Sequence, residues 1–164
     1  MDKRIYREYV AILKEELQPA MGCTEPIAVA YCAALARQTL GALPETVEVL
    51  ASANIIKNVK SVIVPNTNGL RGIAAAAAAG IVADNADAQL QVLAELTPEQ
   101  VESVSTYLEQ AAFTVGRSDK DYVFDIQVRV TAGADSASVR LAIVSAVGSV
   151  TGLSTDKITV LKMK

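Results

Sequence analysis

Apolar residues recur with helical spacing in the first segment of the chain. Over residues 2–17 they follow the i, i+3, i+4, i+7 pattern, and charged residues fill the positions between them. The apolar positions are Tyr6, Tyr9, Val10, Leu13 and Leu17. Pro19 cannot continue a helix, because it lacks a backbone N–H and its ring clashes with the preceding turn. The pattern therefore predicts an amphipathic helix that ends before residue 19.

The next segment predicts a helix that is buried on all sides. Pro26 suits the first turn of a helix that begins near Thr24 or Glu25, since the N–H that it lacks has no helical partner there. The run "IAVAYCAALA" offers no polar face to water. Gly41 follows and is a typical residue at the end of a helix.

The middle of the chain alternates between short elements. "TVEVLAS" has the period of a strand, and "NIIKNVKSVIVP" is irregular before a short apolar strand that ends at Pro65. "NTNG" predicts a turn, and "LRGIAAAAAAGIVA" predicts a helix packed closely against another helix or a second subunit. "AQLQVLAEL" predicts a short helix. Thr97, Pro98 and Gln100 are placed as in a capping box at the start of one more helix.

The C-terminal part reads as strand, helix, strand. "DYVFDIQVRV" alternates and predicts a strand, and "KITVLKM" predicts the last one. Between them the apolar positions fit one helical face capped by Asp135 or Ser136, namely Val139, Ala142, Ile143, Ala146, Val147 and Val150. We therefore expect an α+β fold with helices packed on a small mixed sheet and a C-terminal strand-helix-strand unit joined by a right-handed crossover. A mostly helical region of residues 1–112 and a β-α-β tail of residues 113–164 should pack as one compact unit.

Composition narrows the class of protein. The 164 residues are 51% hydrophobic, 20% charged and 4% aromatic, which is typical of a folded chain whose core is aliphatic. The net charge of −3, without a basic stripe, argues against binding to nucleic acid. No apolar run approaches the length of a membrane span, and the N-terminus lacks the apolar stretch of a signal peptide. We expect a cytoplasmic protein without a membrane partner.

The absence of histidine removes several mechanisms. A Ser-His or Cys-His pair, an imidazole-ligated zinc and a histidine base all need this residue, and the chain has none. The two cysteines, Cys23 and Cys32, cannot complete a site of four thiolates, and their spacing does not favour a disulfide.

Two groups of polar residues could carry chemistry. Cys23, Thr24 and Glu25 lie at a helix start, where the dipole favours an anion and lowers the pKa of a thiol. The alternative is that Thr24 caps the helix, Glu25 complements its dipole and Cys23 fills space, as we expect Cys32 to do in the core. The second group is Ser52, Asn54, Lys57, Asn58 and Lys60, followed by Asn66, Thr67, Asn68, Gly69 and Arg71. It could bind a carboxylate or phosphate, or it could be a polar turn with solvated lysines. Asp121 and Asp125 are further candidates, and Asp125 is expected on a solvated strand face.

Three long stretches resemble one family of enzymes. They are "MGCTEPIAVAYCAA", "NIIKNVKSVIVPNTNGLRGIAAAAAAGIVA" and the run from "LTPEQ" to "VTAGADSA". They are similar to the N-terminal half of the L-cysteine desulfidase family, also described as L-serine dehydratase alpha-subunit-like, and the resemblance covers Leu13 to Val139.

The resemblance implies a cytoplasmic lyase of amino-acid catabolism. Such enzymes use a [4Fe-4S] cluster for β-elimination from a small L-amino acid, cysteine or serine, and form pyruvate and ammonia. Cys23 would be one cluster ligand, and Glu25 and Lys57 would be catalytic, with Lys57 binding the substrate carboxylate or moving a proton. The implied substrate-binding residues are Thr24, Ser52, Asn54, Asn58 and Thr67.

The departures from that family define the alternatives. Its members are more than twice as long, their other cluster cysteines lie in a C-terminal domain, and after about Val139 they carry a histidine motif that this chain lacks. We therefore expect a truncated N-terminal part, or one subunit of a split lyase. Such a chain binds no cluster alone and needs a C-terminal catalytic domain or subunit. The alternatives are an inactive amino-acid-binding or regulatory domain, and a homo-oligomerisation domain built on the alanine-rich helix.

Overall fold

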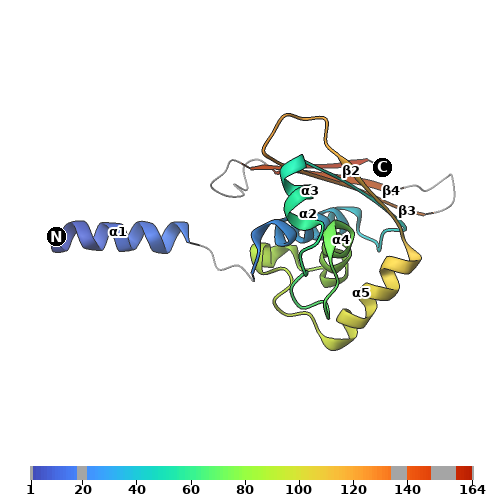
Figure 1. Cartoon of the computed structure of the whole chain (residues 1–164), viewed down its shortest axis with the longest axis horizontal. Coiled ribbons are helices and arrows are strands. Elements are labelled where there is room, and N and C mark those ends of the chain that lie inside the picture. The colour runs from blue at the N-terminus through green and yellow to red at the C-terminus, as the bar shows by residue number, and fades with distance from the viewer. Residues whose placement is uncertain (1, 18–21, 134–139, 149–157, 164) are drawn as a thin grey trace.

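The computed structural model describes residues 2–17, 22–133, 140–148 and 158–163 (Figure 1). Its elements in chain order are α1 (Lys3–Glu16), α2 (Thr24–Leu40), β1 (Thr46–Ala51), α3 (Ala53–Val59), α4 (Gly72–Ala83), the 3-10 helix η1 (Ala86–Gln91), α5 (Pro98–Gln110), β2 (Ala112–Arg117), β3 (Phe124–Ala132), β4 (Arg140–Gly148) and β5 (Ile158–Met163). The α+β class and the mixed sheet are confirmed.

The sheet has the strand order β2-β1-β3-β4-β5. β1 is paired in parallel with β2 and antiparallel with β3, and β4 and β5 continue the sheet in antiparallel fashion. The parallel pair needs a long crossover, which the chain makes with its helices between β1 and β2. The predicted boundary between residues 112 and 113 falls after the first residue of β2, and strands from both sides of it share this sheet.

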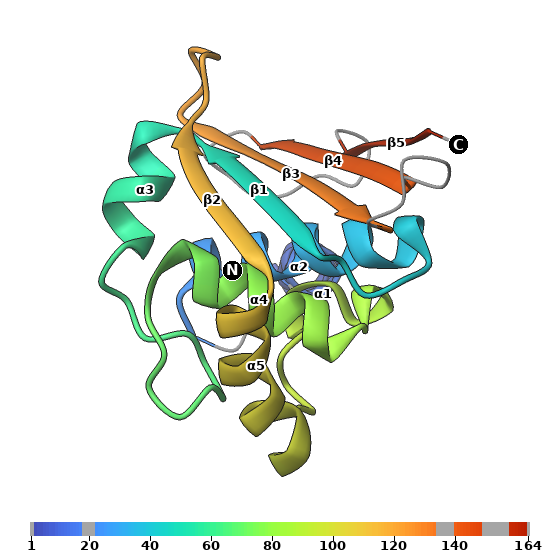
Figure 2. The ribbon, with the colours of Figure 1, turned by 90° about the vertical axis from the view of Figure 1, so that its right-hand side faces the viewer.

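Helix α2 lies between the sheet and α4 (Figure 2). It contacts β3 and β4 on one side and α4 on the other, which explains why its sequence is apolar all round. Gly41, with a φ of 73°, ends the helix in the left-handed conformation as predicted.

The alanine-rich helix α4 packs on α2 within the same chain. Ala75 to Ala79 are at most 4% exposed. At the closest approach Gly80 faces the backbone of Ala30, and a Cβ added to Gly80 would lie 1.9 Å from the Ala30 carbonyl oxygen. The small residues therefore serve the α2–α4 contact. They are not available as a surface for a second subunit, which is the role that the oligomerisation alternative gave them.

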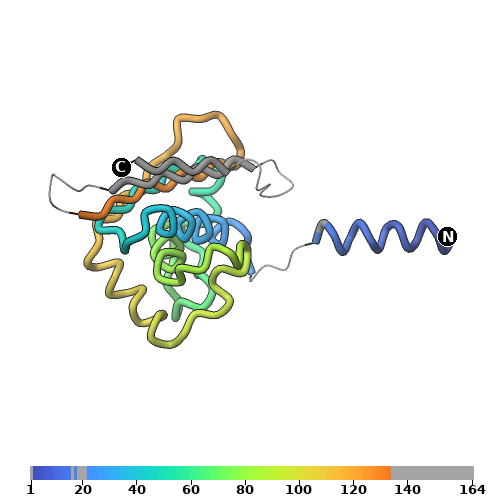
Figure 3. The backbone as a smooth tube through the Cα atoms, turned by 180° about the vertical axis from the view of Figure 1, so that it is seen from behind, coloured from blue at the N-terminus to red at the C-terminus, as the bar shows by residue number. Residues whose placement is uncertain are grey.

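Helix α1 projects away from the body of the molecule in both the front and the rear view (Figures 1 and 3). It is capped by Asp2, whose side chain accepts a hydrogen bond from the Arg4 backbone N–H at 2.8 Å. Its helical state is confirmed, but its apolar face is exposed, with Tyr9 at 58% and Leu13 at 53%. The role of Pro19 lies outside the described residues.

The predicted helix after residue 139 is wrong. Residues 140–148 form strand β4, which pairs with β3 over its whole length. The segment "LAIVSAVG" is rich in residues that suit a strand, and its apolar positions fit a period of two as well as 3.6. Pairing along β3 decides between them, since an unpaired β3 would leave a row of open backbone groups. The proposed caps Asp135 and Ser136 lie outside the described residues.

Two further predictions need correction. Residues 53–59 form helix α3, and the predicted strand before Pro65 is reduced to a single bridge between Ile63 and Arg71. Ser52 starts the helix, because its side chain accepts a hydrogen bond from the backbone N–H of Ile55 at 3.4 Å. Strand β2 was not predicted, although Phe113 and Val115 alternate with less apolar neighbours. In the part of the chain that the structure describes, no helix is long and apolar enough to cross a membrane.

Candidate functional site

The start of α2 is built by a glycine turn and an extended cysteine. Gly22 has a φ of 94°, a conformation that glycine adopts without strain, and a Cβ added to it would lie 3.6 Å from Pro65 Cγ. Cys23 is the N-cap residue with an extended backbone, and its side chain makes no capping hydrogen bond. Thr24 is the first helical residue, so the alternative in which its side chain caps the helix is wrong.

Glu25 joins the two polar groups of the sequence. The Cys23 thiol donates a hydrogen bond from Sγ to Glu25 Oε2 at 3.0 Å. Asn58, on α3, donates from Nδ2 to the other carboxylate oxygen, Oε1, also at 3.0 Å. We call Cys23, Glu25 and Asn58 the Glu25 corner. Cys23 is exposed and the other two side chains are half-buried, so the corner opens to solvent.

The electrostatics of the corner differ from the prediction. The hydrogen bond from Cys23 lowers the pKa of Glu25, and the backbone N–H of Glu25 and the Asn58 amide add to this effect. The pKa of the Cys23 thiol is raised, first by its hydrogen bond to the Glu25 carboxylate and then by partial burial. The predicted lowering by the helix dipole is therefore wrong, because the carboxylate two residues away stabilises the protonated thiol.

Two of the predicted substrate-binding residues serve the fold. Ser52 is 3% exposed, and its hydroxyl donates to the Val123 carbonyl oxygen at 2.8 Å while it also caps α3. Thr67 is 2% exposed and donates to the Val64 carbonyl oxygen at 2.8 Å, which closes the turn of residues 64–67. Neither side chain is open to a ligand.

Three other predicted residues lie at the surface. Thr24 is exposed at the start of α2, and Asn54 and Lys57 are exposed on α3. Lys57 directly precedes Asn58 on α3, and adjacent residues of a helix point to different sides. The structure thus brings Asn58 to Glu25 and Cys23, leaves Lys57 exposed on the same helix as Asn58 and places Ser52 and Thr67 in the interior.

The cysteines do not fit a four-iron cluster within this chain. Cys32 is 1% exposed, with its Sγ 4.0 Å from the Ile126 carbonyl oxygen, so its predicted place in the core is confirmed. Cys23 and Cys32 are not joined by a disulfide. A [4Fe-4S] cluster takes four thiolate ligands, and the sequence offers one accessible thiol. Among the described residues, no three His, Cys, Asp or Glu side chains are grouped to hold a metal ion.

The predicted solvent exposure of Asp125 is wrong. Asp125 is 0% exposed, although strand alternation predicts a solvated face. Its Oδ2 accepts hydrogen bonds from the Ser118 hydroxyl and from Gln127 Nε2, the latter at 2.9 Å. Its Oδ1 has no hydrogen-bond partner. Ser118 belongs to the loop between β2 and β3, and this long-range contact has no signal in the local pattern. Asp121 is exposed.

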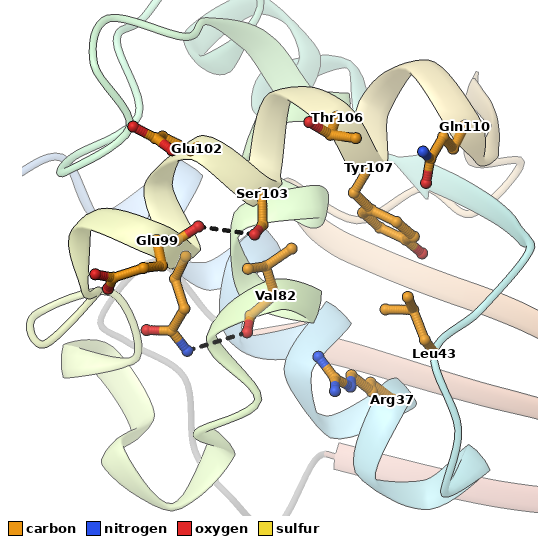
Figure 4. A pocket seen from close by; sticks show the side chains of 10 residues that line it. Arg37, Leu43, Val82, Glu99, Glu102, Ser103, Thr106, Tyr107 and Gln110 are labelled. Carbon is orange, nitrogen blue, oxygen red and sulfur yellow. Dashed lines mark hydrogen bonds between the residues drawn. The ribbon is translucent and has the colours of Figure 1, made fainter.

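A second concave region runs along α5 (Figure 4). We call it the α5 groove. It encloses about 660 Å³, which is within the range of ligand pockets. One wall carries polar side chains of α5, namely Glu99, Glu102, Ser103, Thr106 and Gln110. Arg37, Leu43 and Val82 line it from the opposite side, and Tyr107 lies between them.

Arg37 in that groove is already paired. Its Nη2 lies 3.2 Å from Asp84 Oδ2, and its Nη1 donates to the Ile81 carbonyl oxygen near the end of α4. The Tyr107 hydroxyl donates to the Pro44 carbonyl oxygen at 2.9 Å, and burial raises the pKa of Tyr107. The groove was not predicted, although the polar positions of "TPEQVESVSTYLEQ" repeat along one side of the helix.

The fold and the Glu25 corner define an α+β unit with a solvent-facing thiol, carboxylate and amide. The chain is similar to UPF0597 proteins of several bacteria. The chain is 54% identical over 125 residues to one from Desulfitobacterium hafniense, covering 76% of this chain and 29% of the relative. It is 43% identical over 141 residues to one from Treponema denticola, covering 86% and 33%. A Shewanella relative is 45% identical over 139 residues, covering 85% and 32%.

The chain therefore spans about a third of the length of the curated relatives that it matches. No protein-family model matches the chain. No solved structure matches it either.

These comparisons correct the family assignment. The sequence motifs were interpreted as those of the L-cysteine desulfidase and L-serine dehydratase alpha-subunit-like family. That assignment is wrong, because the relatives are UPF0597 proteins at 43–54% identity and none of them is named as an iron–sulfur lyase.

Proposed function

We propose that the Glu25 corner binds a small L-amino acid and that this chain contributes it to a lyase that performs β-elimination. The observation that carries the proposal is the Glu25 carboxylate, which receives the Cys23 thiol on one oxygen and the Asn58 amide on the other, both at 3.0 Å. These two hydrogen bonds hold the carboxylate in a fixed position. Because Cys23 is exposed, a ligand can reach the corner from solvent.

The charges at the corner suit a zwitterion. The lowered pKa of Glu25 keeps it ionised at neutral pH, so it can accept hydrogen bonds from an α-ammonium group. Lys57 is a compact positive charge on a flexible stem next to Asn58, and it can reach toward an α-carboxylate. Ser52 and Thr67 are buried and have no part in this arrangement.

The chemistry of β-elimination defines which roles the residues of the corner can take and which they cannot. β-Elimination removes a proton from Cα and hydroxide or hydrosulfide from Cβ, and the resulting enamine becomes an imine that water hydrolyses to pyruvate and ammonia. A carboxylate with a lowered pKa is a weak base, so we assign Glu25 to binding and Lys57 to binding the carboxylate or to proton transfer. The group that assists the leaving hydroxide or hydrosulfide would come from outside this chain, since the matched relatives are about three times as long.

Calorimetric titration with L-serine tests the binding step. We expect heat of binding for the wild-type chain, at least a tenfold weaker affinity for Glu25→Gln, and an unchanged affinity for Glu109→Gln, which alters an exposed carboxylate on α5. Equal affinity in Glu25→Gln and the wild type would remove the corner from the site.

The chemical step needs a separate assay. Pyruvate release from L-serine and L-cysteine should be absent for the chain alone. It should appear when the chain is mixed, under anaerobic conditions, with the part of the Desulfitobacterium relative that the match does not cover. Binding of serine without pyruvate in the mixture would contradict the lyase.

A binding or regulatory domain without chemistry is the second candidate. The raised pKa of Cys23 favours it, because a protonated thiol is a poor nucleophile and a poor metal ligand. This candidate predicts that L-serine binds the chain, that Cys23→Ala leaves the affinity unchanged and that no mixture turns the substrate over.

A further inference from the structure

Helix α1 is amphipathic but has no partner for its apolar face in the described structure. Its large apolar side chains are 45–69% exposed, and they are Ile5, Tyr6, Tyr9, Ile12, Leu13 and Leu17. Five of these residues lie on the helix and Leu17 is its C-cap, and together they form an exposed apolar face of the kind that marks a protein interaction site. The helix extends from the body in two opposite views (Figures 1 and 3).

One flank of this apolar face is basic. Lys3, Arg7 and Lys14 are spaced i, i+4 and i+11, which places them along one side of the helix. The other side is mixed, because Arg4 lies there next to Glu8 and Glu15. A groove that covers the apolar face should therefore have an acidic wall beside the basic flank.

The α5 groove has these properties. Glu99 and Glu102 stand on the α5 wall, and both are exposed. Arg37 lines the opposite side, where a further hollow of about 300 Å³ shares Arg37 and Leu43 with the groove. The floor between the walls is apolar, with the half-exposed Leu43, Val82 and the ring of Tyr107 (Figure 4).

We propose that α1 of one copy of this chain docks into the α5 groove of a second copy. The basic flank of α1 then faces Glu99 and Glu102. A helix whose apolar face enters an apolar groove is a common mode of protein recognition. Reciprocal exchange of α1 gives a closed dimer with twofold symmetry in which both grooves are filled.

We propose a second copy of this chain as the partner because α1 and the groove that suits it belong to the same chain. It does not depend on the chemistry of the Glu25 corner. The variants that test it lie on the exposed side chains of α1 and α5, so they leave the core of α2, α4 and the sheet intact.

Sedimentation equilibrium measures the assembly, with charge reversal as the probe. The wild-type chain should have twice its mass of 17.2 kDa. Glu99→Lys with Glu102→Lys, and separately Lys3→Glu with Arg7→Glu, should each weaken the dimer at least tenfold. Their combination should restore it. Glu95→Lys with Glu109→Lys, which makes the same change in net charge away from the groove, should leave it intact.

Three results would overturn the proposal. The first is a wild-type monomer at every concentration, which includes the case of α1 folded back on its own groove. The second is a dimer that either reversal leaves unchanged. The third is a combined variant that stays dissociated.

Discussion

Cys23 and Glu25 show how a neighbour two residues away can oppose a helix dipole. The start of α2 favours an anion, but the Glu25 carboxylate holds the thiol proton at 3.0 Å and raises the pKa of Cys23. The negative charge that the helix end stabilises is therefore on Glu25, whose pKa is lowered. The two shifts have opposite signs because they arise from the same hydrogen bond.

Replacing Glu25 with Gln should make Cys23 more reactive. The amide keeps a hydrogen-bond acceptor but removes the charge, so the pKa of Cys23 should fall and the thiolate fraction should rise. At pH 8 we expect a several-fold faster alkylation by iodoacetamide than in the wild type. The same substitution at Glu109 should have no effect. A rate in Glu25→Gln that equals or falls below the wild-type rate would refute this account of the corner.

Two substitutions of Asp125 should differ in their effect on the free energy of unfolding. Asp125→Ala leaves the Ser118 hydroxyl without its acceptor and Gln127 Nε2 with only its 3.3 Å hydrogen bond to Ser118 Oγ, and should lower the free energy of unfolding by about 2 kcal/mol. Asp125→Asn keeps an acceptor for these donors in a side chain of almost the same shape, so its stability should stay within about 1 kcal/mol of the wild type. Urea unfolding measures both. A larger loss in the asparagine variant than in the alanine variant would contradict the described contacts.

At the scale of elements, the α2–α4 contact limits the size of residue 80. Alanine has a higher helix propensity than glycine by about 1 kcal/mol, and propensity alone predicts that Gly80→Ala stabilises the helix. The clash with the Ala30 carbonyl outweighs it, because the added Cβ would lie 1.9 Å from that oxygen.

We therefore expect Gly80→Ala to lower the free energy of unfolding by about 2 kcal/mol or more. Ser105→Ala on the exposed side of α5 is the control, and it should raise stability by a few tenths of a kcal/mol through propensity alone. Thermal unfolding of the two variants gives the comparison. If Gly80→Ala is as stable as the wild type, the helices do not approach this closely.

The sequence predicts the elements whose signals are local. The capping box of Thr97 and Gln100, the end of α2 at Gly41 and the alternation of β1 are all confirmed, because short-range geometry decides each of them. The local pattern of β4 predicts a helix, because its apolar residues fit both periods and only the pairing with β3 decides between them. The burial of Asp125 depends on Ser118, seven residues away in a loop. Likewise, Glu25 and Asn58 are 33 residues apart in the chain, so local spacing does not predict their hydrogen bond. From spacing alone, the polar residues around Glu25 and those around Asn58 could each have a purely structural role.

At the scale of the whole molecule, one core joins the sheet, α2 and α4. Cys32 lies in this core beside β3, whereas Cys23 is at the surface. A reagent can therefore reach Cys23 in the folded protein, but it can reach Cys32 only when the core opens. Exposure of Cys32 requires α2 to separate from the sheet.

Thiol labelling should reflect this difference. In Cys23→Ser, the remaining Cys32 should resist a thiol reagent in native buffer, and its rate should rise with urea as the population of open molecules rises. In Cys32→Ala, the exposed Cys23 should react in native buffer at a rate that low concentrations of urea do not change. Rapid native labelling of Cys32 would mean that α2 is not held in the core.

A nuclear magnetic resonance titration of the 164-residue chain with L-serine shows directly whether the Glu25 corner binds a small L-amino acid. We expect the backbone amides of Cys23, Thr24 and Glu25 and the side-chain amide of Asn58 to shift first and to saturate together, while the amides around Thr106 in the α5 groove stay in place. Shifts confined to the α5 groove, or no saturable shift at the corner, would contradict it.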